Sequence, residues 1–499
     1  MPKEFAIIDL FAGPGGLGEG FSQAGRDPGA PMKIKLSVEM DDHAIQTLQL
    51  RAFLRSFDEF PQEYHDALNC GSQLPDWADL YPVNWRLATE EARRRVLGEP
   101  GVFEELAVEL DQARENHHGN TILIGGPPCQ AYSLVGRARN KGKAGYVPED
   151  DHRHFLYREY VRILDRLRPA AFVMENVKGM LSSKVDGGGI FSRVLDDLES
   201  AGDGYHLLPL SKPAPSDGSR AAARDFLIRA EDHGVPQARH RVIILGVRSD
   251  LAKGIELEGP IPILGSPQAP VTVAEVLRDL PRLRSGLSRG DDADEWQAAV
   301  QDQAFAIAAL DAAPEEVRKI AHAMARANRL PRLRTGTRRK RSCELPAHLA
   351  DWLLDDRLKV VLQHETRGHI PDDLGRYLFS SAFTRAFGRS PKLAEFPEFL
   401  QPAHRNRGSG DFADRFRTQC ADRPSTTVTS HISKDGHYFI HPDTIQCRSL
   451  TVREAARLQM FPDNYLFCGP RTKQYHQVGN AVPPYLAFQI AKAVRRLLG

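Results

Sequence analysis

The sequence predicts a doubly wound α/β fold of the Rossmann type, joined to a second, smaller domain. Two observations favour this fold: apolar runs alternate with helical patterns over the first 250 residues or so, and a glycine-rich turn follows the first run. A third observation is a change of character after Arg248, which marks the second domain. Four prolines accompany this change: Pro260, Pro262, Pro267 and Pro270.

Predicted strands and helices alternate along the first half of the chain. Each predicted strand is a short apolar run, as expected in a parallel sheet covered by helices on both faces. The predicted strands span residues 5–11, 33–39, 120–126 and 170–176. The predicted helices begin near Leu17 and span residues 44–57, 155–167 and 190–202. Residues 225–248 predict two strands around a loop at Gly234 and Pro236, which would give the sheet an antiparallel edge.

Two further segments complete the predicted organisation. Residues 58–118 are polar and interrupted by prolines, so we interpret them as an insertion with helices near 89–97 and 103–115. Near the C-terminus the amphipathic pattern returns, and four apolar residues share one helical face: Leu486, Ile490, Val494 and Leu497. The first domain is therefore expected to be completed by the end of the chain. The predicted bounds are 1–255 for the first domain, 256–425 for the second, and 426–499 for the returning segment.

Composition and charge exclude several classes of protein. The formal net charge of the 499 residues is +1, so affinity for a polyanion has to come from local patches. The six cysteines form no CxxC pair, and a chain of this length needs no disulfide framework. The first residues carry neither the basic region nor the long apolar run of a signal peptide or membrane span. We therefore expect a soluble cytoplasmic protein.

The stretch FAGPGGLGEG matches the pattern G-x-G-x-x-G through Gly13, Gly15 and Gly18. It follows a predicted strand and precedes a predicted helix, and the acidic Glu39 ends the next strand. Glycines allow the backbone to approach a ligand closely, and an acid at that place can bind a ribose hydroxyl. The pattern alone leaves three possibilities open: a nicotinamide dinucleotide, S-adenosylmethionine, or an ordinary tight turn.

Cys129 follows two prolines at the exit of a predicted strand. Pro127 and Pro128 stiffen the chain just before the thiol, at the edge of the sheet where open α/β folds bind ligands. Glu175 ends the next predicted strand at the same edge. A thiol beside a carboxyl group suits addition to an electron-poor ring. The alternatives are an inert buried cysteine and a solvated carboxylate.

Arg239 and Arg241 stand two apart in the stretch QARHR. On a strand this spacing would direct both guanidinium groups to one face, where they could orient a base or bind phosphate. The alternative is a pair of edge-strand arginines in solvent.

Six stretches together resemble the sequence blocks of DNA (cytosine-5)-methyltransferases, in the same order. The resemblance covers residues 5–248 and 424–496 and leaves the middle of the chain uncovered. The stretches are DLFAGPGGLGEGF, GGPPCQAYSLVGR, FVMENVKGM, GVPQARHRVIILGVR, LTVREAARLQMFPD and QVGNAVPP.

This resemblance implies roles for the residues already named. Cys129 would add to C6 of a flipped cytosine, Glu175 would contact N3, and Arg239 with Arg241 would stabilise the base. The cofactor would be S-adenosylmethionine, bound by Phe11, Gly13, Gly15, Gly16, Leu17, Glu39, Pro127, Asn480 and Ala481. The acid that such enzymes place on the adenine amino group stays open among Asp58, Glu59 and Glu99.

Two basic segments are candidates for contact with duplex DNA. The glycine-rich loop after Cys129, which resembles the family's mobile catalytic loop, carries Arg137 and Arg139. Residues 326–341 carry a basic run within the predicted target-recognition domain, and we expect phosphate contacts at its end. These residues are Arg338, Arg339, Lys340 and Arg341. We expect no metal site, because the spacing of His364, Glu365 and His369 matches no known ligand set.

The leading hypothesis is thus a prokaryotic DNA cytosine-5 methyltransferase, acting alone or beside a restriction or phage-defence nuclease. Three alternatives remain: an RNA cytosine methyltransferase on the same fold, a non-enzymatic DNA-binding relative, and an NAD-linked oxidoreductase. The long middle domain, which suits reading of a duplex, disfavours the first. A non-enzymatic relative is disfavoured because Cys129, Glu175 and the arginine pair are intact. The oxidoreductase rests on the glycine pattern only.

Overall fold

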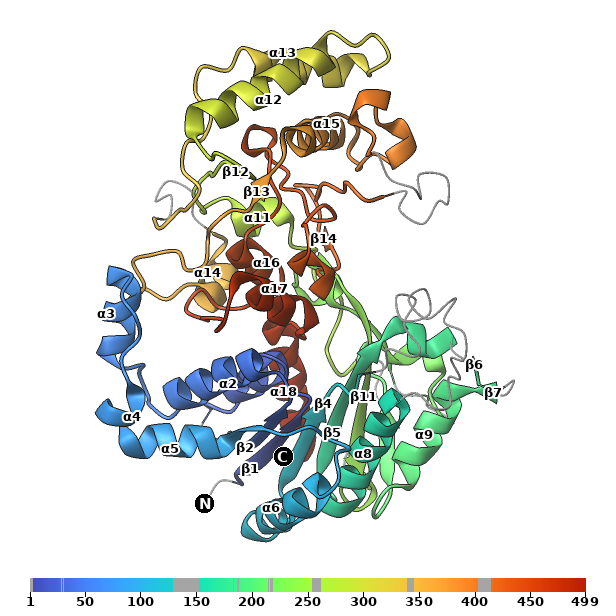
Figure 1. Cartoon of the computed structure of the whole chain (residues 1–499). Helices are drawn as coiled ribbons and strands as arrows, with labels where there is room; N and C mark the ends of the chain where they lie inside the picture. The colour runs from blue at the N-terminus through green and yellow to red at the C-terminus, as the bar shows by residue number, and fades with distance from the viewer. Residues whose placement is uncertain are drawn as a thin grey trace.

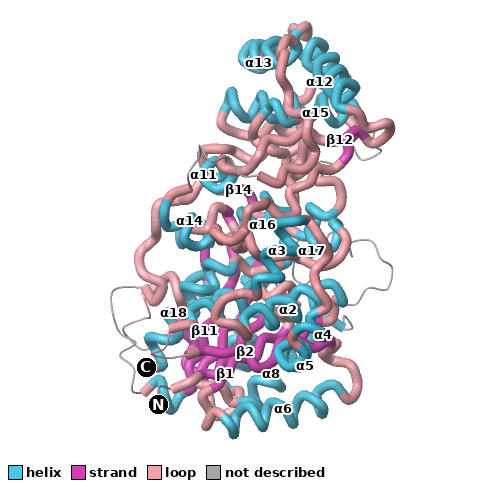
Figure 2. Tube along the Cα trace, turned by 90° about the vertical axis from the view of Figure 1, so that its left-hand side faces the viewer, coloured by secondary structure: helices cyan, strands magenta, loops and turns pink. Residues whose placement is uncertain are grey.

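The computed structural model shows two lobes, with a strand-rich lobe below and a helical lobe above it (Figure 1). A view from the side shows the same separation (Figure 2). The structure describes residues 3–27, 29, 31–128, 152–182, 184–185, 188–213, 215, 219–253, 262–338, 345–402 and 414–499.

The lower lobe is built on an eight-stranded sheet in the order β3-β2-β1-β4-β5-β11-β8, with β9 paired to β11. The pairs from β3 to β5 are parallel, and β11 is antiparallel to its neighbours. All six residues of β1 are buried, because helices cover both faces of the sheet. The strands are β1 (Phe5–Leu10), β2 (Met32–Glu39), β3 (Ala92–Arg94), β4 (Thr121–Gly125), β5 (Ala171–Val177), β8 (Tyr205–Leu208), β9 (Leu227–Arg229) and β11 (His240–Arg248).

The predicted doubly wound fold is confirmed, with two differences. The antiparallel strand β11 lies inside the sheet rather than at its edge, because β8 pairs with its far side. The predicted helix at 89–97 is wrong: α5 ends at Glu91, and β3 then pairs in parallel with β2. Residues 58–118 therefore contribute a strand to the sheet.

Helices cover the two faces of the sheet. One core contains Phe5 and Ile7 of β1, and the other contains Ile8 and Leu10, because successive side chains of a strand point to opposite faces. The helices of the lower lobe are α1 (Gly16–Ala24), α2 (Asp42–Arg55), α3 (Gln62–Cys70), α4 (Trp77–Leu80), α5 (Pro82–Glu91), α6 (Val102–Asn116), α8 (His152–Leu167), α9 (Ile190–Ser200) and α10 (Ser249–Ala252).

The end of the chain packs against the lower lobe. Helix α18 (Pro484–Leu498) packs directly on α1 and buries Leu486, Ile490 and Val494 in the shared core. The contact is close because α1 presents Gly20, where a Cβ would lie 2.4 Å from the backbone nitrogen of Phe488. The helices before it are α16 (Val452–Leu458) and α17 (Arg471–Asn480).

The upper lobe has its own core around Trp296 and Tyr377, formed largely by α12, α13 and α15. Two other helices of the middle region, α11 and α14, pack instead on the core of the lower lobe. The helices are α11 (Val273–Leu277), α12 (Ala293–Ala308), α13 (Glu315–Ala325), α14 (Ala347–Leu353) and α15 (Pro371–Phe387). Short strand pairs are β6 (Lys184–Val185) with β7 (Gly188–Gly189), β10 (Gln237–Ala238) with β14 (Ser425–Thr426), and β12 (Gly286–Leu287) with β13 (Gly368–His369).

One buried ion pair joins the middle region to the C-terminal segment, and two others lie within that segment. The guanidinium group of Arg457, fully buried, pairs with both Asp279 and Asp463. Arg448 pairs with Glu454 at 2.6 Å, and both side chains are buried. Among the described helices, none is long and apolar enough to cross a lipid bilayer.

Candidate active site

The glycine turn after β1 forms an open cradle at the carboxyl edge of the sheet. Phe11, Gly13 and Gly15 have positive φ angles of 54°, 57° and 95°. A side chain at Gly13 would meet no atom within 4 Å, so the backbone there borders open space. A ligand can therefore approach the main chain closely at this turn.

Glu39 fastens this turn to the end of β2. One carboxylate oxygen accepts a hydrogen bond from the backbone N–H of Gly13 at 2.9 Å, and the other accepts from that of Asp41 at 2.9 Å. Asp41 in turn caps α2 and pairs with Lys473 at 2.6 Å. The predicted ribose-binding acid thus lies beside the predicted glycine turn.

The C-terminal segment closes the cradle from the other side. A Cβ at Gly16 would lie 2.2 Å from the carbonyl oxygen of Val482, so the start of α1 and this segment touch through their backbones. Asn480 at the end of α17 is exposed, and the following Ala481 is buried. Leu17 is 5% exposed and its side chain packs in the core.

The candidates for the adenine-binding acid lie in different places. Asp58 and Glu59 follow the end of α2, and the side chain of Glu59 is 88% exposed. Glu99 follows β3, whose last residue, Arg94, is the partner of Glu39 in the sheet register. Glu99 itself is exposed and lies five residues after Arg94.

Glu175 and Arg241 form an ion pair at the carboxyl end of β5. The distance from Nε of Arg241 to Oε1 of Glu175 is 2.8 Å, and the two side chains are only 15% and 14% exposed. The strands bring them together, because Arg241 at the start of β11 is paired with Val177 at the end of β5. A carboxyl group held by a guanidinium is suited to contact the polar edge of a base.

Arg239 makes its hydrogen bonds to the C-terminal segment. It stands between β10 and β11, is 2% exposed, and donates through Nη1 to the carbonyl oxygens of Val428 at 2.9 Å and Gly479 at 3.4 Å. Burial, with Arg241 nearby, holds the pKa of the Arg239 guanidinium well below its usual range. The two predicted arginines thus have different partners: Arg239 is held by backbone carbonyl groups of the C-terminal segment, and Arg241 is held by Glu175.

The described segment that contains β4 ends at Pro128, one residue before Cys129. Its stem is held by β5: Asn176 donates from Nδ2 to the carbonyl oxygen of Pro127 at 3.1 Å. A Cβ at Gly126 would lie 2.8 Å from a carboxylate oxygen of Glu175. The stem therefore runs directly past the Glu175 carboxylate. Six predicted site residues lie outside the described residues: Cys129, Arg137, Arg139, Arg339, Lys340 and Arg341.

The described part of the basic run is only partly available to a partner. Arg338 is exposed, whereas Arg332 pairs with Asp294 at 2.5 Å and Arg334 pairs with Asp291 at 3.0 Å. These two arginines thus contribute to the internal ion pairs of the upper lobe.

The histidines considered for a metal site have other partners. The buried ring of His364 contacts the Thr451 hydroxyl at 2.8 Å and the Pro281 carbonyl at 3.0 Å. His369 is 3.4 Å from the Tyr377 hydroxyl. Glu365 lies on the surface beside Arg471, and its side chain is 56% exposed.

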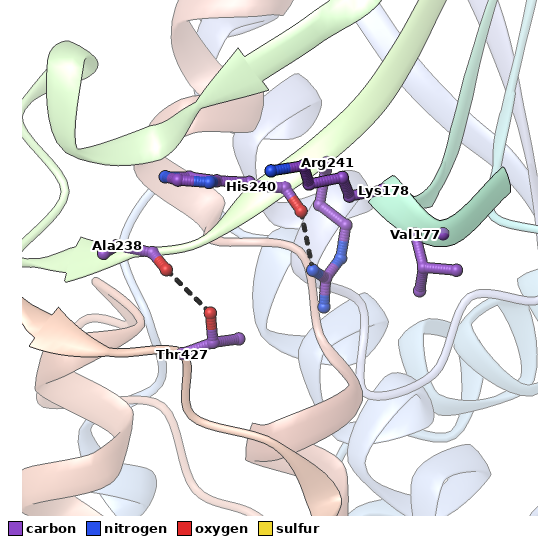
Figure 3. Close-up of a pocket in the computed structure, with 7 residues that line it drawn as sticks. Val177, Lys178, Ala238, His240, Arg241 and Thr427 are labelled. Carbon is purple, nitrogen blue, oxygen red and sulfur yellow. Dashed lines mark hydrogen bonds between the residues drawn. The ribbon is translucent and has the colours of Figure 1, made fainter. Parts of the chain in front are cut away.

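A cavity of about 280 Å³ opens beside the ion pair (Figure 3). Its lining comes from the end of β5, the start of β11 and the segment around Thr427. Thr427 donates to the carbonyl oxygen of Ala238 at 2.7 Å, which ties the last segment to the QARHR stretch. The residues that line the cavity are Val177, Lys178, Gly179, Ala238, His240, Arg241 and Thr427.

Two supporting residues were not singled out from the sequence. Gln237 is fully buried, donates to the carbonyl oxygen of Leu458 at 3.1 Å and accepts from the N–H of Val428 at 2.7 Å. Asn176 holds Pro127 as described above. Their signal was a polar residue close to a predicted site residue: Asn176 directly follows Glu175, and Gln237 stands two residues before Arg239.

Comparison with known proteins gives consistent matches. Residues 108–496 match the model of the family described as C-5 cytosine-specific DNA methylase. The type II methyltransferase M.Bpa9945I of Bacillus paralicheniformis is 33% identical, over 99% of both chains. The type II methyltransferase M.AgeI of Thalassovita gelatinovora is 28% identical, over 98% of both.

A solved structure supports the fold. It is a prophage-encoded DNA modification methyltransferase from E. coli, which aligns over 99% of both chains with a TM-score of 0.52 and 20% identity. The family match, together with the full-length relatives, decides against an oxidoreductase, which rested on the glycine pattern alone. The chain belongs to the C-5 cytosine-specific DNA methylase family and is a DNA (cytosine-5-)-methyltransferase.

Proposed function

We propose that this enzyme methylates C5 of cytosine within a specific duplex DNA sequence, using S-adenosylmethionine and a covalent bond between Cys129 and C6 of a flipped base. The observation that carries this proposal is the ion pair of Glu175 and Arg241, which stands at the edge of the sheet beside the stem of Cys129. The type II methyltransferases among its relatives support a role in a restriction-modification or phage-defence system.

The cradle after β1 fits the proposed cofactor. Open space at Gly13 and a carboxylate at Glu39 suit an extended nucleoside with a ribose to be held. When bound, S-adenosylmethionine supplies an electrophilic methyl group. The residues proposed to hold it are Phe11, Gly13, Gly15, Gly16, Leu17, Glu39, Pro127, Asn480 and Ala481, with Leu17 acting through its backbone.

The proposed chemistry begins with addition of the Cys129 thiolate to C6. The carboxyl group of Glu175 contacts N3 as the ring takes up the electron pair, so C5 becomes the nucleophilic carbon of an enamine. After C5 has gained its methyl group, its proton passes to solvent water, and elimination of the thiolate from C6 restores the aromatic base. Arg241 holds the Glu175 carboxylate in place throughout.

The proposed DNA contacts lie on both lobes. Arg137 and Arg139 in the loop after Cys129 would contact the target strand, and Arg338, Arg339, Lys340 and Arg341 would contact phosphates from the upper lobe. A cognate restriction or defence nuclease is the proposed partner in the cell, and the cytoplasm, where the DNA lies, is the proposed location.

The test uses purified enzyme, labelled S-adenosylmethionine and duplex DNA, with bisulfite sequencing to locate the modified cytosines. Label should enter DNA at C5 of one defined sequence. Arg241→Ala should reduce the rate of methyl transfer by about 10²-fold or more, because the Glu175 carboxylate loses the group that orients it. Arg248→Ala is the matched control, since Arg248 lies at the other end of β11 and pairs with an exposed Asp250. Label in RNA alone, or equal rates for both variants, would refute the proposal.

A further inference from the structure

Basic side chains line the cavity beside the ion pair. Lys178, His240 and Arg241 line it, and no aspartate or glutamate is among the described residues of its lining. Lys178 is exposed, while His240 and Arg241 are partly buried. A cavity with cationic and no anionic groups at its surface favours an anion. Figure 3 shows the side chains of His240 and Arg241 leaving β11 in different directions, with Lys178 on the turn after β5 beside them.

His240 is held in place by a buried carboxylate. Its Nε2 lies 2.7 Å from Oε1 of Glu231, and the side chain of Glu231 is only 8% exposed. The same oxygen accepts from Nε of Arg229 at 3.2 Å, and Arg229 is the partner of His240 in the register of β9 with β11. Because a carboxylate accepts only, Nε2 of His240 is the donor in this contact.

This contact leaves the other ring nitrogen available. Among the described residues, no hydrogen-bond partner stands against Nδ1 of His240, and the ring is 33% exposed. When the ring is charged, Nδ1 is also a donor, and the Glu231 carboxylate balances that charge. Such a preoriented donor loses little freedom when it binds an anion.

The anion that belongs at this place follows from the substrate. A cytosine that enters the site of Glu175 and Arg241 brings the phosphates on either side of its sugar with it. The cavity borders that ion pair through Arg241.

We infer that His240, held by Glu231, binds together with Lys178 a backbone phosphate next to the flipped cytosine. His240 is thus a positioning residue for the extruded nucleotide. This inference rests on the proposed function, because it presupposes a flipped base. It adds the Glu231–His240 pair as a specific phosphate contact in the wall of the site.

The first test measures the salt dependence of DNA binding. The variant His240→Gln keeps an amide that can donate to Glu231 but carries no charge. It should weaken binding to the methylated sequence by roughly 5-fold and reduce the slope of log K against log salt by about 0.9, the value of one phosphate contact. Lys178→Gln should do the same. The matched control is His206→Gln, since His206 is exposed on β8 opposite Val247, at the other end of β11. An unchanged slope in both cavity variants would overturn the inference.

The second test locates the phosphate. Phosphates flanking the target cytosine are replaced one at a time by neutral methylphosphonate, and each duplex is bound to wild-type enzyme and to His240→Gln. At one position, the neutral replacement should weaken DNA binding by the wild-type enzyme and leave DNA binding by His240→Gln unchanged. If the loss of affinity from each phosphate replacement simply added to the loss from His240→Gln at every position, the inference would be overturned. A third outcome is that inorganic phosphate competes with DNA at matched ionic strength while no replaced phosphate affects the wild type alone. That result would assign the cavity to a free anion and would also overturn the inference.

A covalent trap separates this inference from the proposed function. A duplex with 5-fluorocytosine at the target is incubated with each enzyme and S-adenosylmethionine. If wild type forms an adduct while His240→Gln binds DNA like wild type, only the phosphate contact is wrong. If wild type forms no adduct, the proposed mechanism is wrong, whatever the binding data show.

Discussion

Gly16→Ala tests whether the C-terminal segment is part of the cofactor site. A Cβ at Gly16 would lie 2.2 Å from the carbonyl oxygen of Val482, whereas ordinary contact begins at 3.4 Å. The Val482 backbone would therefore have to withdraw by about 1.2 Å. Asn480 and Ala481 directly precede Val482, so the proposed wall of the cofactor site moves with it.

This displacement should affect catalysis and stability together. A shift of about 1 Å in a positioning group can lower a rate by about 10²-fold, and overpacking typically lowers the free energy of unfolding by about 1–3 kcal/mol. The assays are calorimetric titration with S-adenosylmethionine, initial rates of methyl transfer, and urea unfolding. Affinity for the cofactor should fall in Gly16→Ala, along with the rate.

Gly71→Ala serves as the matched control. Gly71 ends α3 with a φ of +66°, and a Cβ there would meet no atom within 4 Å. The left-handed conformation alone should lower stability by about 1–2 kcal/mol and leave cofactor binding unchanged. If Gly16→Ala bound S-adenosylmethionine as tightly as Gly71→Ala does, the proposed contribution of the C-terminal segment would be refuted.

Three other perturbations test the stability of the fold and the DNA contacts. Arg457→Met leaves Asp279 and Asp463 buried without their cation and should lower the free energy of urea unfolding by about 3–5 kcal/mol; a loss below about 1 kcal/mol would contradict this. Burial lowers the pKa of His364 from 6.5 to about 4 in the folded protein. Between pH 6.5 and pH 4 the His364 ring therefore binds a proton only in the unfolded chain, so the free energy of unfolding should fall as the pH drops through this range. His364→Asn should flatten this part of the stability profile, and an equal slope in the variant would argue against the assignment. Arg338 is exposed, and Arg338→Gln should weaken DNA binding and reduce its salt dependence. If the affinity and its salt dependence stayed unchanged, Arg338 would not contact DNA.

Much of the sheet could be predicted because its central strands are encoded locally. The runs that became β1, β4 and β5 are mostly apolar, as is typical of strands in a parallel sheet covered on both faces. The strands β3 and β8 carry weaker signals. Ala92–Arg94 ends in two arginines, and Tyr205–Leu208 alternates irregularly between buried and exposed. Their pairing depends on neighbouring strands, which a local pattern does not report.

The candidate site was predicted to a similar extent. Strand ends place Glu39 and Glu175 at one edge of the sheet, so the spacing of motifs was sufficient for them. The different partners of Arg239 and Arg241 were not predictable, because Arg239 binds the carbonyl groups of Val428 and Gly479, which lie far away in the sequence. The Glu231–His240 contact likewise arises only when β9 and β11 pair.

The most direct test of the mechanism is the mass of the enzyme after reaction with a duplex that carries 5-fluorocytosine at the methylated position. Fluorine at C5 prevents loss of the proton that normally releases the base. With S-adenosylmethionine present, wild type should therefore gain the mass of the methylated duplex strand, and peptide mapping should place the bond at Cys129. Cys129→Ser should retain cofactor binding and gain no mass. A stable adduct in that variant, or none in a wild type that methylates unmodified DNA, would contradict the role of Cys129.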